Sequence, residues 1–207
     1  MPEKKPLKKG PKVNPHIKPI VRNPHAVLRG LAREVAVDVI TGKEIQGLLE
    51  DMRSTLANTP DGVGIAAPQL GVPLRVFLVS DEAEEIDKAE KAGWKRRNKE
   101  NNYERNEPAY LQRPWKYYTF INPKIKNISK ERTEGPEGCL SVPATYGTVK
   151  RFAKITMQAY DEKGKKFTRG ASNFFARVMQ HEIDHLNGTL FIDKVDEWID
   201  PEKSSSK

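Results

Sequence analysis

QHEIDHLNG, at residues 180–188, contains two histidines four positions apart. Residues at this spacing on a helix lie on one face with their Cβ atoms about 5–6 Å apart, so His181 and His185 can bind one metal ion. Glu182 directly follows the first histidine, where a carboxylate can take a proton from water at the metal. A catalytic metal site usually has three protein ligands and one open position. The rest of the sequence must therefore supply a third ligand.

The length and composition fit one globular domain. The 207 residues suffice for a hydrophobic core. No run approaches the ~18–20 apolar residues of a membrane span, and the charged, proline-rich start lacks the apolar part of a secretory signal. We expect no membrane association and a cytoplasmic location, with an organelle lumen as the alternative. The single cysteine, Cys139, excludes an intrachain disulfide.

The positive charge is concentrated at the start of the chain. The formal net charge is +8, and residues 1–20 carry six lysines against one glutamate. Because the remainder is nearly balanced, we expect a flexible basic leader over 1–20 and no specific DNA binding. A leader that is simply solvated is the plainer interpretation, and contact with RNA, including a ribosome, is the alternative.

The hydrophobic pattern predicts an α+β fold, with short antiparallel β-sheets around a central metal-binding helix. Apolar residues at helical spacing predict helices over 41–58 and 172–187, the second ending at Asn187-Gly188. Residues 81–113 are rich in charge and poor in apolar groups, so we expect a solvated insertion with a helix near 82–98. The expected strands are 74–79, 117–121, 124–128, 153–160 and 165–168, followed by a short apolar strand or turn at 189–195.

Several residues could be the third ligand. Some HExxH proteases use HExxHxxGxxH, but position 191 is Phe here, which excludes that class. Cys139 lies in EGCLS at 137–141, after a glycine that lets another backbone approach, and a thiolate binds zinc or ferrous iron strongly. The other candidates lie in a polar terminal segment or beside prolines: Glu197, Glu202, His16 and His25.

Three segments together resemble the signature motifs of the peptide deformylases. These are GVGIAAPQ at 62–69, EGCLS at 137–141 and QHEIDH at 180–185, in the order that the family has. The resemblance covers roughly residues 20–196, and three motifs are far more specific than one. The expected organisation is a flexible basic leader over 1–20, a catalytic domain over 21–196 with a charged insertion at 81–113, and a disordered tail over 197–207.

The resemblance implies a metal-dependent amide hydrolase. Its substrate would be the N-formyl group on the initiator methionine of nascent polypeptides, released as formate. Fe²⁺ would be the native metal, with Zn²⁺, Ni²⁺ or Co²⁺ as substitutes. Glu182 would act as general base and acid, and the Gln69 side-chain amide and the Leu140 backbone N–H would stabilise the oxyanion. The implied metal ligands are Cys139, His181 and His185.

The same resemblance suggests how the substrate binds. Gly64 and Gly138 would leave room for its backbone to pair as an added strand. The methionine side chain needs an apolar slot, for which core packing of the same residues is an equal alternative. The slot would be formed by Val63, Phe174 and Val178.

Residues around the motifs carry further expectations. Arg151 would pair with Glu137 near the cysteine, and Asp184 would orient a ligand or the base, although ordinary surface roles fit both equally. Ile183 stands where the family more often has Phe or Met. Arg177 and the long insertion are similar to the organelle-type branch. We expect no counterpart of the long C-terminal helix by which some bacterial members dock on ribosomes, which leaves the basic leader as the candidate for ribosome contact.

Two other functions fit the HExxH helix. An endopeptidase would keep its activity after Cys139→Ser and would cleave internal bonds. A binding module with a structural metal would have no open coordination position and would not depend on Glu182.

Overall fold

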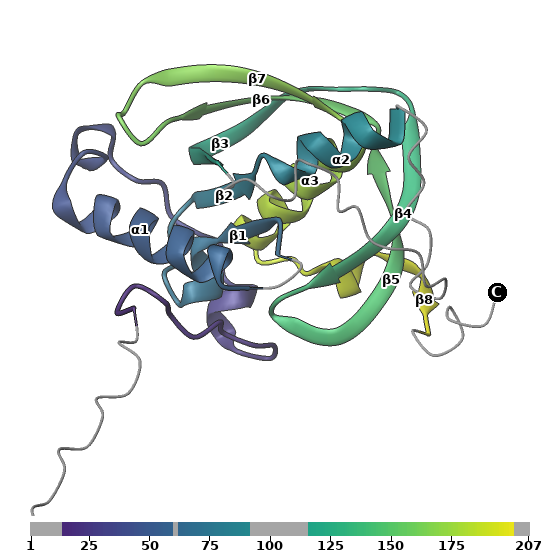
Figure 1. Ribbon diagram of the computed structural model, residues 1–207, viewed down its shortest axis with the longest axis horizontal. Coiled ribbons are helices and arrows are strands. Elements are labelled where there is room, and N and C mark those ends of the chain that lie inside the picture. Colours follow the sequence, from purple (N-terminus) through teal and green to yellow (C-terminus); the bar gives the residue numbers. More distant parts are fainter. Residues whose placement is uncertain (1–13, 60–61, 92–115, 201–207) are drawn as a thin grey trace, which may run out of the picture.

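The computed structural model describes residues 14–59, 62–91 and 116–200. The predicted α+β class is confirmed, with two antiparallel sheets and a central helix, α3, between them (Figure 1). No helix in these ranges is long and apolar enough to cross a membrane. The α-helices are α1 (Lys43–Ala57), α2 (Glu82–Lys91) and α3 (Asn173–Leu186), and the strands are β1 (Gly64–Ala66), β2 (Val76–Ser80), β3 (Tyr117–Ile128), β4 (Arg132–Cys139), β5 (Val142–Phe152), β6 (Lys154–Tyr160), β7 (Lys166–Ser172) and β8 (Val195–Ile199).

The larger sheet has both faces covered around its strand β2. Its strand order is β1-β2-β3-β6-β7. Every residue of β2 is buried, because Phe77 and Val79 face the core around α3 while Val76 and Leu78 face the core around α1. This explains the continuous apolar run in β2, which is typical of a strand between two layers.

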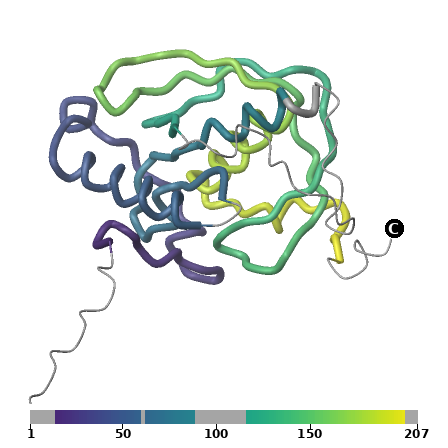
Figure 2. The backbone as a smooth tube through the Cα atoms, viewed as in Figure 1, coloured from purple at the N-terminus to yellow at the C-terminus, as the bar shows by residue number. Residues whose placement is uncertain are grey.

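The smaller sheet is a long hairpin joined by the C-terminal strand. Its order is β4-β5-β8. The chain path brings β8 alongside β5, where Trp198 lies opposite Gly147 (Figure 2). The prediction of a disordered tail over 197–207 is therefore wrong for residues 197–199, because they belong to β8 and extend the sheet. Residues 201–207 lie outside the described part of the chain.

The β4–β5 hairpin is the main element that the hydrophobic pattern missed. In β4 (RTEGPEGC), glycine, proline and charged residues replace the β-branched and aromatic residues that mark a strand. Pairing with β5 along its length forms the strand all the same. Strand β7 also continues to Ser172, four residues beyond the predicted end.

The prediction that residues 1–20 form a flexible leader is wrong for residues 14–20, which the structure describes. The Lys18 backbone N–H donates to Thr55 Oγ1 at 2.9 Å, and His16 Nδ1 lies 2.7 Å from Asp51 Oδ1. These contacts place residues 14–20 against α1. Residues 1–13, which carry most of the leader lysines, lie outside the described residues.

Helix α3 ends at Leu186, directly before Asn187-Gly188, where its end was predicted. Gly188 has φ +72°, which favours glycine. A Cβ at this position would also lie only 2.6 Å from the Arg29 carbonyl oxygen. The close approach is a second reason for glycine after the end of α3.

The start of α3 depends on α2. Ser172, at the N-cap position, makes no side-chain capping bond. Instead the Asp87 carboxylate accepts hydrogen bonds from the backbone N–H groups of Phe174 at 2.9 Å and Phe175 at 3.1 Å. Ala83 and Ile86 of α2 are buried. The expectation of a solvated insertion is therefore wrong for its first turns, which pack on α3; residues 92–115 lie outside the described ranges.

Replacing Asp87 with Ala removes this cap and leaves two backbone donors without an acceptor at the start of α3. We expect the free energy of unfolding to fall by about 1–2 kcal/mol, which lowers Tm by about 2–8 °C in a protein of this size. Thermal denaturation followed by circular dichroism measures the change. Asp87→Asn keeps one acceptor oxygen and should lose less; an unchanged Tm for Asp87→Ala would contradict the capping role.

Candidate active site

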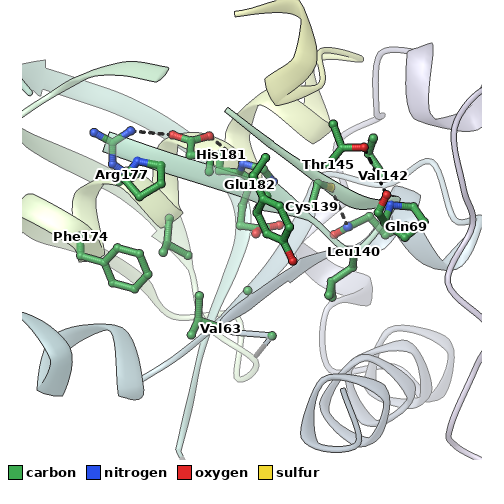
Figure 3. A pocket seen from close by; sticks show the side chains of 18 of the residues that line it. Val63, Gln69, Cys139, Leu140, Val142, Thr145, Phe174, Arg177, His181 and Glu182 are labelled. Atoms are coloured by element: carbon green, nitrogen blue, oxygen red, sulfur yellow. Dashed lines mark hydrogen bonds and ion pairs between the residues drawn. The ribbon is translucent and has the colours of Figure 1, made fainter. Parts of the chain in front are cut away.

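The sequence-predicted residues meet at one cavity of about 400 Å³ between β1, the β4–β5 hairpin and α3. In Figure 3, Val63 and Phe174 lie on one side, Gln69 and Leu140 lie on the other, and Glu182 lies between them. His185 is buried beside Cys139 and does not line the cavity wall. The predicted residues that line it are Val63, Gly64, Gln69, Gly138, Cys139, Leu140, Phe174, Val178, His181 and Glu182.

The three expected ligands form a compact donor set. One ligand atom each from Cys139, His181 and His185 lies within 4.8 Å of the others, and Cys139 Sγ is 3.2 Å from His185 Nε2. Donor atoms at 2.0–2.3 Å around a tetrahedral ion are roughly 3–4 Å apart. One thiolate and two imidazoles suit zinc or ferrous iron. These residues therefore fit a divalent metal and leave one position open.

The local backbone structure orients each of the three donor side chains. The histidines face one way because they are four residues apart on α3. On β4, the pairing register with β5 breaks between Gly138 and Cys139, and such an irregularity redirects the side chain that follows it. The Ser141 backbone N–H lies 3.4 Å from Cys139 Sγ. The turn after β4 thus holds the sulfur against the histidine pair.

Glu137 orients His181. Its Oε2 accepts a hydrogen bond from His181 Nδ1 at 2.9 Å, which leaves Nε2 available to bind a metal. Arg151 donates to both carboxylate oxygens of Glu137 at 2.8 Å, so the predicted pair is present. Burial alone would raise the pKa of Glu137, but hydrogen bonds from Arg151 and His181 hold it well below its usual range. Glu137 is therefore a buried anion that fixes the histidine.

The hydrogen-bond network around Glu137 extends to further charged residues on α3 and β5 and to Lys194. Arg177, on α3, donates to Glu137 Oε1 at 2.9 Å. Arg151 also bonds Asp184, which accepts from Lys194 at 2.6 and 2.7 Å. Asp184 is thus a buried member of the network, and the surface alternative for it is wrong. The remaining acceptors of Arg177 are the carbonyl oxygens of Thr133, Gly135 and Val149.

Glu182 has a free carboxylate oxygen. The residue is 3% exposed, and its Oε2 has no hydrogen-bond partner among the described residues. Burial, together with the nearby Glu137 charge, raises the pKa of Glu182 to about 7 against the opposing effect of His181. A group that gains and loses a proton near neutral pH suits a general base and acid.

The two glycines serve the protein's own packing. A Cβ on Gly64 would lie 2.5 Å from Glu182 Oε1, and a Cβ on Gly138 would lie 2.8 Å from the Tyr146 ring. Both glycines line the cavity, as predicted, but their immediate neighbours are these side chains. Gly64 therefore makes room for the carboxylate of Glu182.

Gln69 has a fixed orientation. Its Oε1 accepts from the Ala66 backbone N–H at 2.8 Å, so Nε2 points toward Ser141 Oγ at 3.3 Å and Cys139 Sγ at 3.7 Å. The side chain is only 2% exposed. Its amide N–H groups are thus held beside the ligand set, next to the turn that contains Leu140.

Several residues in or next to the cavity were not predicted. Ser141 is fully buried and positions Gln69, and its only signal was its place in the EGCLS motif. The far rim comes from β5, which the pattern did not predict, so nothing in the sequence pointed to these residues. They are Val142, Pro143, Ala144, Thr145 and Tyr146.

Comparisons with known proteins agree with this geometry. A sequence model of the family described as polypeptide deformylase matches residues 17–200. The chain is 36% identical over 176 residues to peptide deformylase 1A, chloroplastic/mitochondrial, of Arabidopsis thaliana, which covers 85% of this chain and 60% of that protein. It is 37% identical over 182 residues to the peptide deformylase of Rhizobium meliloti, covering 86% of this chain and 85% of the relative. The chain thus spans about 60% of the plant protein's length.

Solved structures of the same fold also match. A Met-Ala-Ser-bound class I type b peptide deformylase from Acinetobacter baumannii superposes with a TM-score of 0.68 at 29% identity, covering 86% of this chain and 98% of that one. A peptide deformylase from Legionella pneumophila gives 0.65 at 33% identity, covering 90% and 88%. With its Cys-His-His donor set, the chain belongs to the polypeptide deformylase family, metal-dependent hydrolases whose known function is the deformylation of nascent polypeptides.

Proposed function

We propose that this chain removes the N-formyl group from the initiator methionine of newly synthesised polypeptides and releases formate. The observation that supports this most directly is the convergence of three groups on one cavity. The free Oε2 of Glu182 and the oriented amide of Gln69 lie there beside the Cys139-His181-His185 donor set.

Each residue of the site has a separate role in the proposed hydrolysis. Cys139, His181 and His185 would hold a divalent metal, which would supply Lewis-acid polarisation of the formyl carbonyl and would lower the pKa of water. Glu182 takes the proton of the attacking water at Oε2 and gives it to the leaving amine nitrogen. The Gln69 amide and the Leu140 backbone N–H donate to the oxygen that becomes negative. Because Gln69 is buried and fixed by the Ala66 backbone N–H, this donor needs little reorganisation as charge develops.

The cavity walls suit an extended peptide end. Strands β1 and β4 are terminal strands of their sheets, and both border the cavity. A substrate backbone can add to such an edge by main-chain hydrogen bonds. The methionine side chain then enters the apolar side of the cavity, formed by Val63, Phe174 and Val178.

The native metal in this proposal is Fe²⁺, with Zn²⁺, Ni²⁺ or Co²⁺ as substitutes. A thiolate ligand suits each of these ions, and because a thiolate–iron site reacts with oxygen, we expect the Fe²⁺ form to lose activity in air. Anaerobic purification followed by metal analysis tests the assignment.

The cellular setting in this proposal is the cytoplasm. There the lysine-rich residues 1–20 contact ribosomes by charge. A fluorescent fusion tests the location against an organelle lumen, and co-sedimentation with ribosomes, with and without residues 1–13, tests the contact.

Glu182→Gln should abolish most formate release from formyl-Met-Ala-Ser. The amide cannot accept the proton, so we expect kcat to fall by about 10²–10⁴-fold. Metal content should stay the same, because Glu182 is not a ligand. Formate is measured with the anaerobically prepared enzyme, and metal by elemental analysis. If wild type loaded with iron, nickel or cobalt released no formate, the proposed function would be refuted. Full activity of the variant would refute only the role of Glu182.

Glu137→Gln should weaken metal binding. The neutral amide loses the charged hydrogen bond to His181 Nδ1, and changes to such supporting partners typically cost 10–100-fold in metal affinity. Competition with a chromophoric chelator measures the affinity of the metal-free protein for Zn²⁺. Glu134→Gln is the matched control, since Glu134 lies on the same strand but is exposed and paired only with Lys150. Equal affinities for the two variants would contradict the orienting role.

Gly64→Ala should lower kcat while leaving metal binding intact. The new Cβ would lie 2.5 Å from Glu182 Oε1 and would displace the carboxylate. A displacement near 1 Å can reduce turnover by about 10²-fold. Gly47→Ala serves as the control, because its Cβ would meet nothing within 4 Å. Steady-state kinetics showing an unaltered kcat for Gly64→Ala would rule out this steric role.

A further inference from the structure

The two donors proposed for the oxyanion belong to different sheets. Gln69 lies in the 3-10 helix η3 (Ala67–Leu70), directly after β1 of the larger sheet. Leu140 lies in the turn between β4 and β5 of the smaller sheet. In the described ranges, no backbone hydrogen bond joins η3 to this turn directly. Because both donors must point at one oxygen, other contacts have to fix their separation.

A short segment near the start of the chain is hydrogen-bonded to both places. The Val21 backbone N–H donates to the carbonyl oxygen of Gln69 at 2.8 Å. Two residues later, the Asn23 backbone N–H donates to the carbonyl oxygen of Ser141 at 2.9 Å. Since Ser141 directly follows Leu140, residues 21–23 bridge η3 and the β4–β5 turn at the two donors.

Ser141 links this bridge to the donor groups themselves. The residue is fully buried, and its Oγ accepts a hydrogen bond from Gln69 Nε2 at 3.3 Å. Its backbone N–H donates to Cys139 Sγ at 3.4 Å. With the bond from Asn23, the N–H, the hydroxyl and the carbonyl of Ser141 each have a partner. A shift of residues 21–23 would therefore be passed to the turn that presents the Leu140 N–H.

The segment is attached to the fold on either side of the bridge. Before it, the Lys18 backbone N–H donates to Thr55 Oγ1 of α1 at 2.9 Å. After it, the Ala32 backbone N–H donates to the carbonyl oxygen of Leu186, the last residue of α3, at 3.0 Å. None of residues 21–23, all of which the structure describes, lines the cavity. The segment can therefore affect the reaction only through the residues that it holds.

We propose that Val21 and Asn23 are positioning residues, whose backbone N–H groups hold Gln69 and the Leu140–Ser141 turn at the separation that the oxyanion requires. This inference rests on the proposed function, because the oxyanion forms in that reaction. A segment that only stabilises the fold would change Tm and leave turnover of the folded enzyme intact. Misplaced oxyanion donors instead lower kcat and leave KM nearly unchanged, because they act in the transition state.

The kinetic test compares two proline variants of the full-length, nickel-loaded protein. Val21→Pro removes the N–H that bonds Gln69. Ile20→Pro is the matched control, since the Ile20 N–H makes no backbone hydrogen bond in the described ranges. For formyl-Met-Ala-Ser we expect Val21→Pro to lower kcat at least ~10-fold, because loss of one such donor costs about 10²–10³-fold and a 1 Å displacement about 10²-fold. KM of this variant, and both constants of Ile20→Pro, should stay within about twofold of wild type.

A second measurement reports the position of Gln69 without any turnover. The zinc-loaded proteins are labelled with ¹⁵N-glutamine, since Zn²⁺ has no unpaired electrons to broaden the signals. The side-chain NH₂ signals of Gln69, identified by their loss in Gln69→Glu, should move in Val21→Pro and stay in place in Ile20→Pro. If circular dichroism shows that Val21→Pro does not fold, an ester in place of the Ile20–Val21 amide removes the same N–H and keeps the valine side chain.

Four results would overturn the inference. They are an unchanged kcat in the folded Val21 variant, equal losses in both variants, a raised KM at constant kcat, and Gln69 signals that do not move. Wild type that releases no formate would instead refute the proposed function. The Gln69 signals would still decide whether residues 21–23 position this amide.

Discussion

The buried carboxylate of Glu137 is the interaction on which the site depends. It accepts hydrogen bonds from His181, Arg151 and Arg177, and so connects β4 and β5 to α3. Moving an ion of this kind out of water costs several kcal/mol, which only well-placed partners can offset. Removing one partner would leave a charge buried without compensation, at about 3–5 kcal/mol. The candidate metal ligands come from β4 and α3, so this ionic network helps to fix the position of Cys139 relative to the histidine pair.

Much of the site could be predicted because its chemistry is local in sequence. The histidine pair is set by helical spacing, the end of α3 by Gly188, and Glu182 by its position next to a ligand. Spacing alone could not identify Cys139 as the third candidate ligand. It lies 42 residues before His181, and the β4–β5 hairpin brings it next to the histidines. The family motifs connected Cys139 with the histidine pair, which hydrophobic periodicity could not do.

What the sequence did not reveal depends on contacts between distant segments. Strand β4 forms because β5 pairs with it, although its glycines and proline argue against a strand. Asp87 looked like one more acid in a charged run, yet it caps the helix that carries the histidines. Tyr146 could not be placed at the rim before the hairpin was known. In each case the deciding partner belongs to another element of the fold, beyond the reach of pattern reasoning.

The position of β1 and β4 has a consequence for self-association. A terminal strand normally offers its unpaired backbone to other copies of a chain, which leads to aggregation. Here both strands border the active-site cavity, and side chains such as Phe174 and Tyr146 flank the approach. A folded protein cannot bring a strand into that space, whereas an unfolded chain end can. The same enclosure that protects these edges from unwanted pairing would therefore also select for substrates that have not yet folded.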